Sequence, residues 1–383
     1  MVKVNLELVE IFKEEFGAET VTECFNCGNC TAICPVSTVD HLFPRRLIRY
    51  VQLGLEEKLL EAPETWWCLT CRQCTVTCPR QAYPTELMVA IRKDAIESGR
   101  APPHIRDFLT NIQKQKNPWG VGKFKRDQWV KKANVEVPTV KTNQEFEWLW
   151  FVDCAHSFDN RNVPVSNMIA EILNHIGINY AILGREEGCC GNDVRRAGEE
   201  GLFQLLKEEN EKTFGKYGVE KILVASPHCY NTFKNEYDGY EVKLVLEVIL
   251  DAIKSGKLEL KKPIEKKVVY HDSCFLGRYN DIYELPREVL RAIPGIELVE
   301  MPRSYQQALC CGGGGGLVVS EYPGEIRVNN ERAKEAAETG ADILAVACPF
   351  CMIMLEDGVK AEKVDDKIEV KDIIELVWES AFG

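Results

Sequence analysis

Residues 343–351 read ILAVACPFC, an apolar run that ends in a Cys-x2-Cys pair. Residues 222–229, ILVASPHC, repeat the pattern earlier in the chain, with Ser226 where the later copy has Cys348. A short run of Val, Ile and Leu of this kind is typical of a strand in a parallel sheet that is covered on both faces. Ligands of open α/β sheets bind at the carboxyl ends of such strands, so the cysteines of both stretches lie where this fold places its chemistry.

These two stretches belong to an internal repeat that covers residues 146–383. Each copy has one cysteine after a first apolar run, then Cys-Cys-Gly, then a second apolar run that ends in a cysteine, and the gaps between matching cysteines are nearly equal. Such self-similarity indicates one shared fold. We predict that residues 146–262 form the first copy and residues 263–383 the second.

Within each copy, short apolar runs alternate with amphipathic stretches of helical periodicity, at residues 201–217 in the first copy and 326–340 in the second. This alternation predicts an α/β domain built from parallel sheets with helices on their faces. The predicted strands are residues 148–154, 180–184, 221–226, 267–272, 296–301 and 342–348.

Eight cysteines near the start of the chain form two C-x2-C-x2-C-x3-C-P motifs, at residues 24–35 (CFNCGNCTAICP) and 68–79 (CLTCRQCTVTCP). This is the spacing of bacterial two-cluster ferredoxins, in which three thiolates of a motif hold one cluster and the fourth ligates the other. A pair of structural zinc sites is the alternative, but zinc sites usually offer two pairs of ligands rather than two runs of four that end in Cys-Pro. We assign one [4Fe-4S] cubane to Cys24, Cys27, Cys30 and Cys78, and the other to Cys68, Cys71, Cys74 and Cys34.

The region around these motifs has helical periodicity over residues 41–60 and 84–98, so residues 1–100 are predicted to be an α-helical ferredoxin-type domain. Residues 101–145 are rich in Lys, Pro and Gln and are interpreted as a linker. Three apolar residues of this linker are expected to pack on one of the domains: Phe108, Leu109 and Trp119.

Composition limits the class of protein further. The chain has 383 residues, of which 45% are hydrophobic, and a formal net charge of -12, which excludes a disulfide-stapled mini-protein or a disordered chain and argues against nucleic acid as the main partner. No apolar run is long enough to cross a membrane, and the first residues lack the pattern of a signal peptide. We therefore expect a cytoplasmic protein, in which 17 cysteines indicate metal ligation or redox chemistry rather than disulfides.

The pattern Cys, Cys-Cys-Gly, Cys-x2-Cys resembles the CCG domain of the B and D subunits of heterodisulfide reductase, which also occurs in the iron-sulfur subunits of glycolate, lactate and glycerol-3-phosphate dehydrogenases. The N-terminal module resembles the C subunit of that reductase and the iron-sulfur subunits of succinate dehydrogenase and fumarate reductase, and its fusion to two CCG copies resembles the D subunit. In that family five cysteines hold a noncubane [4Fe-4S] cluster. Adjacent side chains diverge, so a vicinal pair suits two irons of such an open cluster.

The resemblance implies a complete noncubane site in the second copy only, because Ser226 replaces the fifth cysteine of the first copy and a hydroxyl is a poor iron ligand beside thiolates. The first copy either holds a further iron-sulfur cluster at its remaining cysteines or is empty. Those remaining cysteines are Cys154, Cys189, Cys190 and Cys229. The predicted catalytic site of the second copy consists of Cys274, Cys310, Cys311, Cys348 and Cys351.

Several residues near these cysteines have two interpretations. Gly312 to Gly316 allow either close approach of the backbone to a cluster, with N–H groups donating to its sulfurs, or a flexible turn. Histidines near the ligands are either proton donors to a leaving thiolate or polar residues satisfied locally: His156, His228 and His271. Arginines near the complete site either clamp an anionic thiol substrate or form surface ion pairs: Arg278 and Arg303. Arginines of the first predicted helix form either a docking patch or a solvated face: Arg45, Arg46 and Arg49.

Two functions are implied by the resemblance. In the first, the chain is an oxidoreductase of anaerobic metabolism, a heterodisulfide reductase-like subunit that passes electrons from two cubanes to the noncubane site, which reduces or forms a disulfide of the CoB–CoM type between small thiol cofactors. In the second, it is a relay without catalysis between a flavoprotein dehydrogenase and quinone. The chain has no flavin or nicotinamide motif, so electrons come from a partner: a membrane cytochrome b, a flavoprotein or a ferredoxin. Any contact with a membrane would be peripheral and through such a partner.

Overall fold

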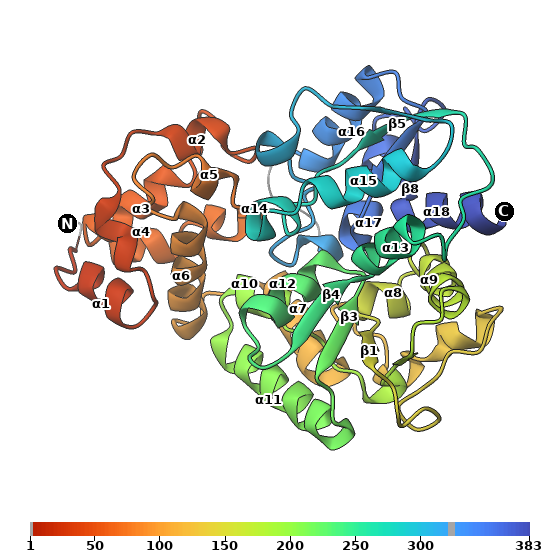
Figure 1. Ribbon diagram of the computed structural model, residues 1–383. Helices are drawn as coiled ribbons and strands as arrows, with labels where there is room; N and C mark the ends of the chain where they lie inside the picture. Colours follow the sequence, from red (N-terminus) through yellow and green to blue (C-terminus); the bar gives the residue numbers. More distant parts are fainter. Residues whose placement is uncertain (1–2, 321–325) are drawn as a thin grey trace.

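The computed structural model describes residues 3–320 and 326–383. A helical module at the N-terminus lies beside two α/β copies, each with its own four-stranded parallel sheet (Figure 1). The predicted fold class, a helical ferredoxin-type domain followed by two CCG copies with parallel sheets, is confirmed.

The N-terminal module consists of short helices that surround the two cysteine motifs. Its helices are α1 (Leu8–Glu14), α2 (Asn29–Ile33), α3 (Arg45–Gln52), α4 (Glu56–Leu60), α5 (Gln73–Val76) and α6 (Pro84–Glu97). The periodicity over residues 41–60 forms two helices rather than one, because the chain turns at Gly54 with φ 67°. A Cβ atom at Gly54 would lie 2.2 Å from the carbonyl oxygen of Asn5, so this turn requires glycine.

The segment 101–145, expected to be a linker, is an ordered layer on the first copy. It contains α7 (Pro103–Gln115) and two 3-10 turns, η3 (Lys123–Lys125) and η4 (Gln128–Lys132). Phe108 and Trp129 are buried in the same hydrophobic core as the first sheet, and Leu109 and Trp119 pack against that core, as expected for the apolar residues of this segment. The domain boundaries that the sequence indicates stay a prediction.

The two sheets have the same order, β2-β1-β3-β4 and β6-β5-β7-β8, and all their pairings are parallel. The first sheet consists of β1 (Trp148–Phe151), β2 (Tyr180–Ala181), β3 (Lys221–Val224) and β4 (Glu241–Leu244). The second consists of β5 (Lys266–Tyr270), β6 (Ile296–Val299), β7 (Ile343–Val346) and β8 (Glu369–Asp372). Strands β4 and β8 were not predicted, since these edge strands read EVKL and EVKD and lack a long apolar run.

Helices follow the strands in both copies. The first copy contains α8 (Cys154–Phe158), α9 (Val163–His175), η5 (Gly184–Glu186), α10 (Asn192–Ala197), α11 (Glu200–Tyr217), α12 (Pro227–Asn235) and α13 (Val245–Lys254). The second contains α14 (Gly277–Asn280), α15 (Glu284–Ala292), η6 (Tyr305–Gln307), η7 (Leu317–Val319), α16 (Val328–Glu338), α17 (Pro349–Ala361) and α18 (Ile373–Phe382). A 3-10 turn also precedes each ferredoxin-type motif, η1 (Glu19–Glu23) and η2 (Pro63–Trp67).

The hydrophobic cores show which parts of the chain are joined. One core contains α7, the first sheet and one side of the second copy, for example Trp150 and Ile373. The other contains the N-terminal module together with the second copy, for example Leu47, Met88 and Leu344. The ferredoxin-type module therefore shares its core with the second copy, and this places the second motif close to the predicted catalytic cysteines.

Across residues 3–320 and 326–383, the structure contains no helix with the length and apolar character that a membrane crossing requires.

Candidate iron-sulfur sites

The eight cysteines of the N-terminal module gather around two cavities. Cys24, Cys27, Cys30 and Cys78 line one of them, and Cys34, Cys68, Cys71 and Cys74 line the other. In each set, three thiols come from one motif and the fourth from the other motif. The structure thus brings together the two sets to which the sequence assigns the two cubanes, and the ligand assignment itself stays a prediction.

Donor groups surround the thiols of this module. The backbone N–H groups of Thr70 and Ala82 donate to the sulfur atoms of Cys68 and Cys78, each at 3.4 Å. Burial, opposed in part by the nearby Arg92 guanidinium, raises the pKa of Cys68 to about 11. Without metal this thiol is protonated at neutral pH, so a metal that binds here must displace a proton.

The two cavities differ in their access to solvent. Cys27, in the first cavity, is exposed, whereas Cys68 and Cys71 of the second cavity are buried. The first cavity therefore lies nearer the outside of the molecule and the second lies inward, towards the CCG copies.

The five predicted cysteines of the second copy form one contiguous group. Cys274 follows β5, Cys310 and Cys311 precede the glycine-rich loop, and Cys348 and Cys351 begin α17. Their thiols lie next to one another in the order Cys274, Cys310, Cys311, Cys351, Cys348. Each of these residues is at most 8% exposed.

One thiol of the N-terminal module reaches this group. The Cys71 thiol, from the second ferredoxin-type motif, lies beside the thiol of Cys310. One cysteine of the second cavity and one of the complete CCG copy are therefore neighbours. Sequence reasoning had no signal for this contact, because the two cysteines lie on separate modules.

Two histidines border the complete site. A ring nitrogen of His271 and the sulfurs of Cys311 and Cys351 all lie within 4.8 Å of one another, and the Nε of Arg332 donates to His271 Nδ1 at 3.1 Å. His228 comes from the first copy, yet its Nδ1 lies 3.7 Å from the sulfur of Cys348.

The surroundings of His228 differ from those of the third histidine. Burial lowers the pKa of His228, but the nearby Cys348 thiolate outweighs burial and raises it to about 9. His156 instead hydrogen-bonds the Asp153 carboxylate at 2.6 Å, so it is a buried polar residue satisfied by its neighbour.

The glycine-rich loop has two kinds of contact. The N–H of Gly312 donates to the sulfur of Cys310 at 3.4 Å. A Cβ atom at Gly314 would lie 2.0 Å from the carbonyl oxygen of Leu69, and one at Gly315 would lie 2.6 Å from that of Cys68. The loop is therefore not a plain flexible turn, because at Gly314 and Gly315 the backbone of the second ferredoxin-type motif approaches it closely. Close approach of this loop to a cluster stays a prediction.

The two arginines singled out near the complete site have different surroundings. Arg278 is only 7% exposed, and its guanidinium donates to three backbone carbonyls, which rules out a role as an open clamp for substrate. Arg303 is half exposed and pairs with Glu335 at 3.1 Å, so it forms an ion pair at the surface.

In the first copy the four remaining cysteines also meet. The thiols of Cys154, Cys189 and Cys190 follow one another, and the sulfur of Cys229 lies 3.1 Å from that of Cys190. Ser226 is the N-cap of α12, the place that Cys348 occupies at α17, which supports the alignment of the two copies.

A buried arginine neighbours these thiols. Arg126 donates to the sulfur of Cys154 at 3.5 Å and pairs with Glu187 at 2.9 Å, and both members of the pair are at most 2% exposed in their side chains. Sequence analysis missed this pair because Arg126 lies in the segment interpreted as a linker.

The residues at these sites fit iron-sulfur clusters. Apart from the ring nitrogen of His271, the convergent donors are soft thiols, which suit iron-sulfur clusters, and the second CCG group contains five of them. Buried donors without a partner lie beside them: Nη2 of Arg278 and Nε1 of Trp67 make no hydrogen bond within the described part of the chain. Such N–H groups would be satisfied by the sulfur atoms of a cluster.

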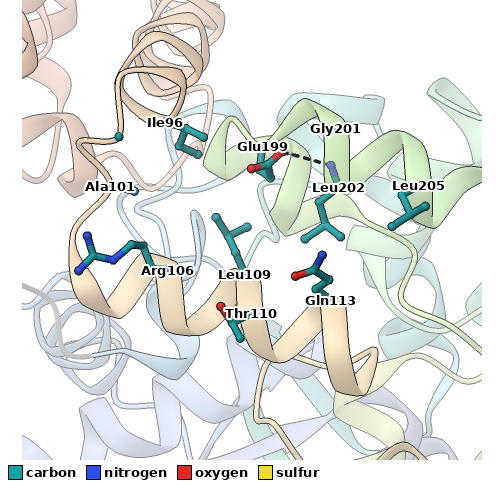
Figure 2. Close-up of a pocket in the computed structure, with 11 residues that line it drawn as sticks. Ile96, Ala101, Arg106, Leu109, Thr110, Gln113, Glu199, Gly201, Leu202 and Leu205 are labelled. Atoms are coloured by element: carbon teal, nitrogen blue, oxygen red, sulfur yellow. Dashed lines mark hydrogen bonds between the residues drawn. The ribbon is translucent and has the colours of Figure 1, made fainter.

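A groove elsewhere on the molecule differs in character. It has a volume of about 480 Å³ and lies between α7 and α11, where Leu109 and Gln113 face Leu202 and Leu205 (Figure 2). Its described lining residues include no cysteine and no histidine, so the groove is separate from the thiol sites.

Comparison with known proteins identifies the family. Residues 148–234 and 268–356 match the cysteine-rich CCG domain, and residues 20–82 match the 4Fe-4S dicluster domain. The chain is 32% identical to the D subunit of the dihydromethanophenazine:CoB–CoM heterodisulfide reductase of Methanosarcina barkeri, over 93% of both chains. The chain belongs to the family of heterodisulfide reductase D subunits. The dicluster match favours iron-sulfur over zinc at the two N-terminal motifs.

Other members of this wider group are longer. The chain is 33% identical to the probable iron-sulfur-binding oxidoreductase FadF of Bacillus subtilis, over 99% of this chain and 64% of the relative. It is also 33% identical to the EtfAB:quinone oxidoreductase of Syntrophomonas wolfei, over 98% of this chain and 61% of the relative. The chain therefore spans less than two thirds of the length of these two relatives.

Proposed function

We propose that this chain accepts electrons at its ferredoxin-type module and passes them to the second CCG copy, where a disulfide between small thiol cofactors is reduced or formed. The observation that carries the proposal is that the thiols of Cys71 and Cys310 are neighbours, which connects the second cavity to the five thiols of the second CCG copy. The shared hydrophobic core of the module and the second copy supports the same route of transfer.

The cysteines and the histidines of these sites would have different roles. Eight cysteines would hold two cubane clusters, and the five-thiol group would hold a noncubane one. When bound, such clusters supply one-electron transfer, whereas a disulfide takes two electrons. His271 and His228 place ring nitrogens beside the thiols of this group, where the departing thiolate of a substrate would need a proton.

The partners of the chain are part of the proposal. Because Cys27 is exposed, the first cavity would be the entry point for electrons from a partner protein. A flavoprotein, a ferredoxin or a membrane cytochrome b would each supply them. One relative, from Chromohalobacter salexigens, is described as a probable membrane-anchored ferredoxin, so association with a membrane through another segment or subunit fits the wider group.

Electron paramagnetic resonance on the oxidised, purified protein tests the catalytic role. We expect that coenzyme M or coenzyme B, added singly as the thiol, produces a new paramagnetic signal that broadens when the sample is enriched in 57Fe. Replacement of Cys351 by Ser should abolish that signal. If a panel of cofactor thiols produces no signal on a protein with all its clusters, the second copy is not a disulfide site.

A relay without catalysis is the second candidate, and a specific observation favours it. Each of the five thiols of the second copy is at most 8% exposed, which suits a conducting site more than one that opens to substrate. The name of the Syntrophomonas wolfei relative also points to electron transfer from a flavoprotein to quinone. A relay predicts that reduced electron-transfer flavoprotein reduces the clusters at a catalytically competent rate and that thiols leave every signal unchanged.

A further inference from the structure

We propose that Arg278 is a positioning residue that fixes the second ferredoxin-type loop against the complete CCG site and thereby sets the rate of electron transfer between them. The proposal rests on the proposed function, because it concerns the crossing point between the two sites. Arg278 lies on α14, directly after the loop that carries Cys274.

The guanidinium of Arg278 ties two loops together. Its Nε donates to the carbonyl oxygen of Cys71 at 2.6 Å, and its Nη1 donates to the carbonyl oxygens of Ala308 at 2.7 Å and Gln306 at 3.3 Å. Cys71 belongs to the N-terminal module, whereas Ala308 lies two residues before Cys310. One planar group therefore fixes the backbone on both sides of the contact between the Cys71 and Cys310 thiols.

Neighbouring side chains hold the same loop from other directions. The hydroxyl of Tyr279 donates to the carbonyl oxygen of Thr70 at 2.8 Å, and Nη2 of Arg92 donates to that of Cys68 at 2.7 Å. Together with the bond from Arg278, these contacts fix the loop at three of its main-chain carbonyls. Among these donors, only Arg278 also reaches the backbone next to Cys310 within the described part of the chain.

The glycine-rich loop completes the fit. Gly314 and Gly315 leave room for the carbonyl groups of Leu69 and Cys68, which approach to distances that any Cβ atom would forbid. The two backbones are therefore in contact without intervening side chains. Small displacements here translate directly into separation of the Cys71 and Cys310 thiols.

Arg278 also brings a buried positive charge to the crossing point. Its Nη2 is buried and makes no hydrogen bond to any described residue. A fixed cation beside both sets of thiolates favours the reduced, more negative state of either site. In the transfer itself, one electron leaves the site that contains Cys71 and arrives at the site that contains Cys310, and no bond or proton moves.

Two substitutions of Arg278 separate position from charge. In R278K the charge remains but the fork that holds two loops is lost, and in R278Q both are lost. We expect iron content to match wild type in both variants, and the transfer rate to fall about 10- to 100-fold, as it does when residues around metal ligands are changed. The midpoint potential of the second CCG site should fall in R278Q and stay near the wild-type value in R278K. Arg291→Gln, which removes an exposed arginine of the same copy, is the charge control.

The measurement is made on the full chain with all its clusters. Photoreduced deazaflavin serves as electron donor, and freeze-quench electron paramagnetic resonance follows the reduction of each site in time. A wild-type second copy that never receives electrons from the module would overturn the proposed function. If transfer proceeds in the wild type and the rates of R278K and R278Q both lie within twofold of the wild-type rate, the role of Arg278 is overturned and the proposed function is not.

A backbone variant keeps the proposal testable if R278Q fails to retain iron. Gly314→Ala leaves every cysteine and arginine in place but forces the Leu69 carbonyl away, so we expect a similar slowing of transfer with unchanged midpoint potentials. Gly215→Ala is the matched control, because a methyl group there meets no atom within 4 Å. Transfer at the wild-type rate in Gly314→Ala, with iron retained, would show that close contact of the two loops does not limit the rate.

Discussion

The two CCG copies have the same sheet order but differ in the segment directly after the Cys-Cys-Gly sequence. In the first copy Asn192 begins helix α10 at once, and the thiols are bordered by the buried pair Arg126 and Glu187. In the second copy a run of glycines comes next, and the N-terminal module fills the space that they leave. In the second copy the module therefore lies directly against the segment that follows the vicinal cysteines. In the first copy it meets the end of α10 instead, where Nη1 of Arg92 donates to the carbonyl oxygen of Arg196 at 3.0 Å.

This difference accompanies the change in ligands. The first copy has Ser226 at the N-cap of α12, and the second has Cys348 at the N-cap of α17. The copy that lacks a thiol has no direct thiol contact to the module among the described cysteines, whereas the copy with five has one through Cys71. The comparison teaches that two copies of one fold have diverged at their cysteines, and that the copy whose thiols neighbour the N-terminal module is the one with five of them.

The largest expected effect comes from removing a thiol of the connected copy. Cys351→Ser should lose the paramagnetic signal of the second site and lower its rate of electron uptake by at least about 100-fold, because even substitutions outside the ligand set cost 10- to 100-fold at metal sites. Cys229→Ser, at the aligned position of the first copy, should leave that signal in place. The reverse result, a signal lost in Cys229→Ser and kept in Cys351→Ser, would exchange the roles of the copies.

The next effect concerns the buried pair that borders the thiols of the first copy, Arg126 and Glu187. Arg126→Met leaves the carboxylate of Glu187 buried without its cation, so we expect the free energy of unfolding to fall by about 3–5 kcal/mol. Anaerobic denaturant titration measures the change. The double variant Arg126→Met, Glu187→Gln removes the stranded charge and should recover most of the loss. A single variant as stable as wild type would mean that the first copy does not depend on this pair.

The smallest effect concerns the aligned position at which the first copy has Ser226 and the second has Cys348. Ser226→Cys restores the fifth thiol of the first copy and should convert it into a second site of the complete type, which roughly doubles the noncubane signal. Iron analysis accompanies the measurement: about 12 irons per chain in the wild type indicates an empty first copy, and about 16 indicates a cluster there. Ser226→Ala is the control and should change neither quantity. An unchanged signal in Ser226→Cys would show that the surroundings of Arg126 also prevent the complete site.

Sequence patterns predicted the parts of the structure that local chemistry determines. The six apolar strands, the helices α6, α11 and α16, and the duplicated α/β fold follow from hydrophobic periodicity and from an internal repeat. The edge strands β4 and β8 were not predicted, because a strand with one neighbour and a solvent-facing side does not need a continuous apolar run.

Contacts between modules could not be predicted in this way. His228 belongs to the first copy by sequence but lies beside Cys348 of the second, and Arg278, next to a ligand loop, holds backbone rather than substrate. Both placements depend on how complete domains pack, which no local pattern specifies. The run of glycines is the sequence feature that came closest to predicting a contact between modules, because five consecutive residues without side chains indicate that another backbone or a ligand approaches.

The hydrogen bonds from Arg278, Tyr279 and Arg92 to the second ferredoxin-type loop all end on main-chain carbonyls. The interface therefore recognises the path of the loop. Two side chains between the cysteines add to it: Gln73 Nε2 donates to the carbonyl oxygen of Gln307 at 3.2 Å, and the Arg72 guanidinium lies over the ring of Tyr279. A loop that has not yet closed around its metal follows another path and cannot offer those carbonyls in register. We expect the N-terminal module to dock on the second copy only after its metal site has been assembled. The interface would then select modules that already contain their metal.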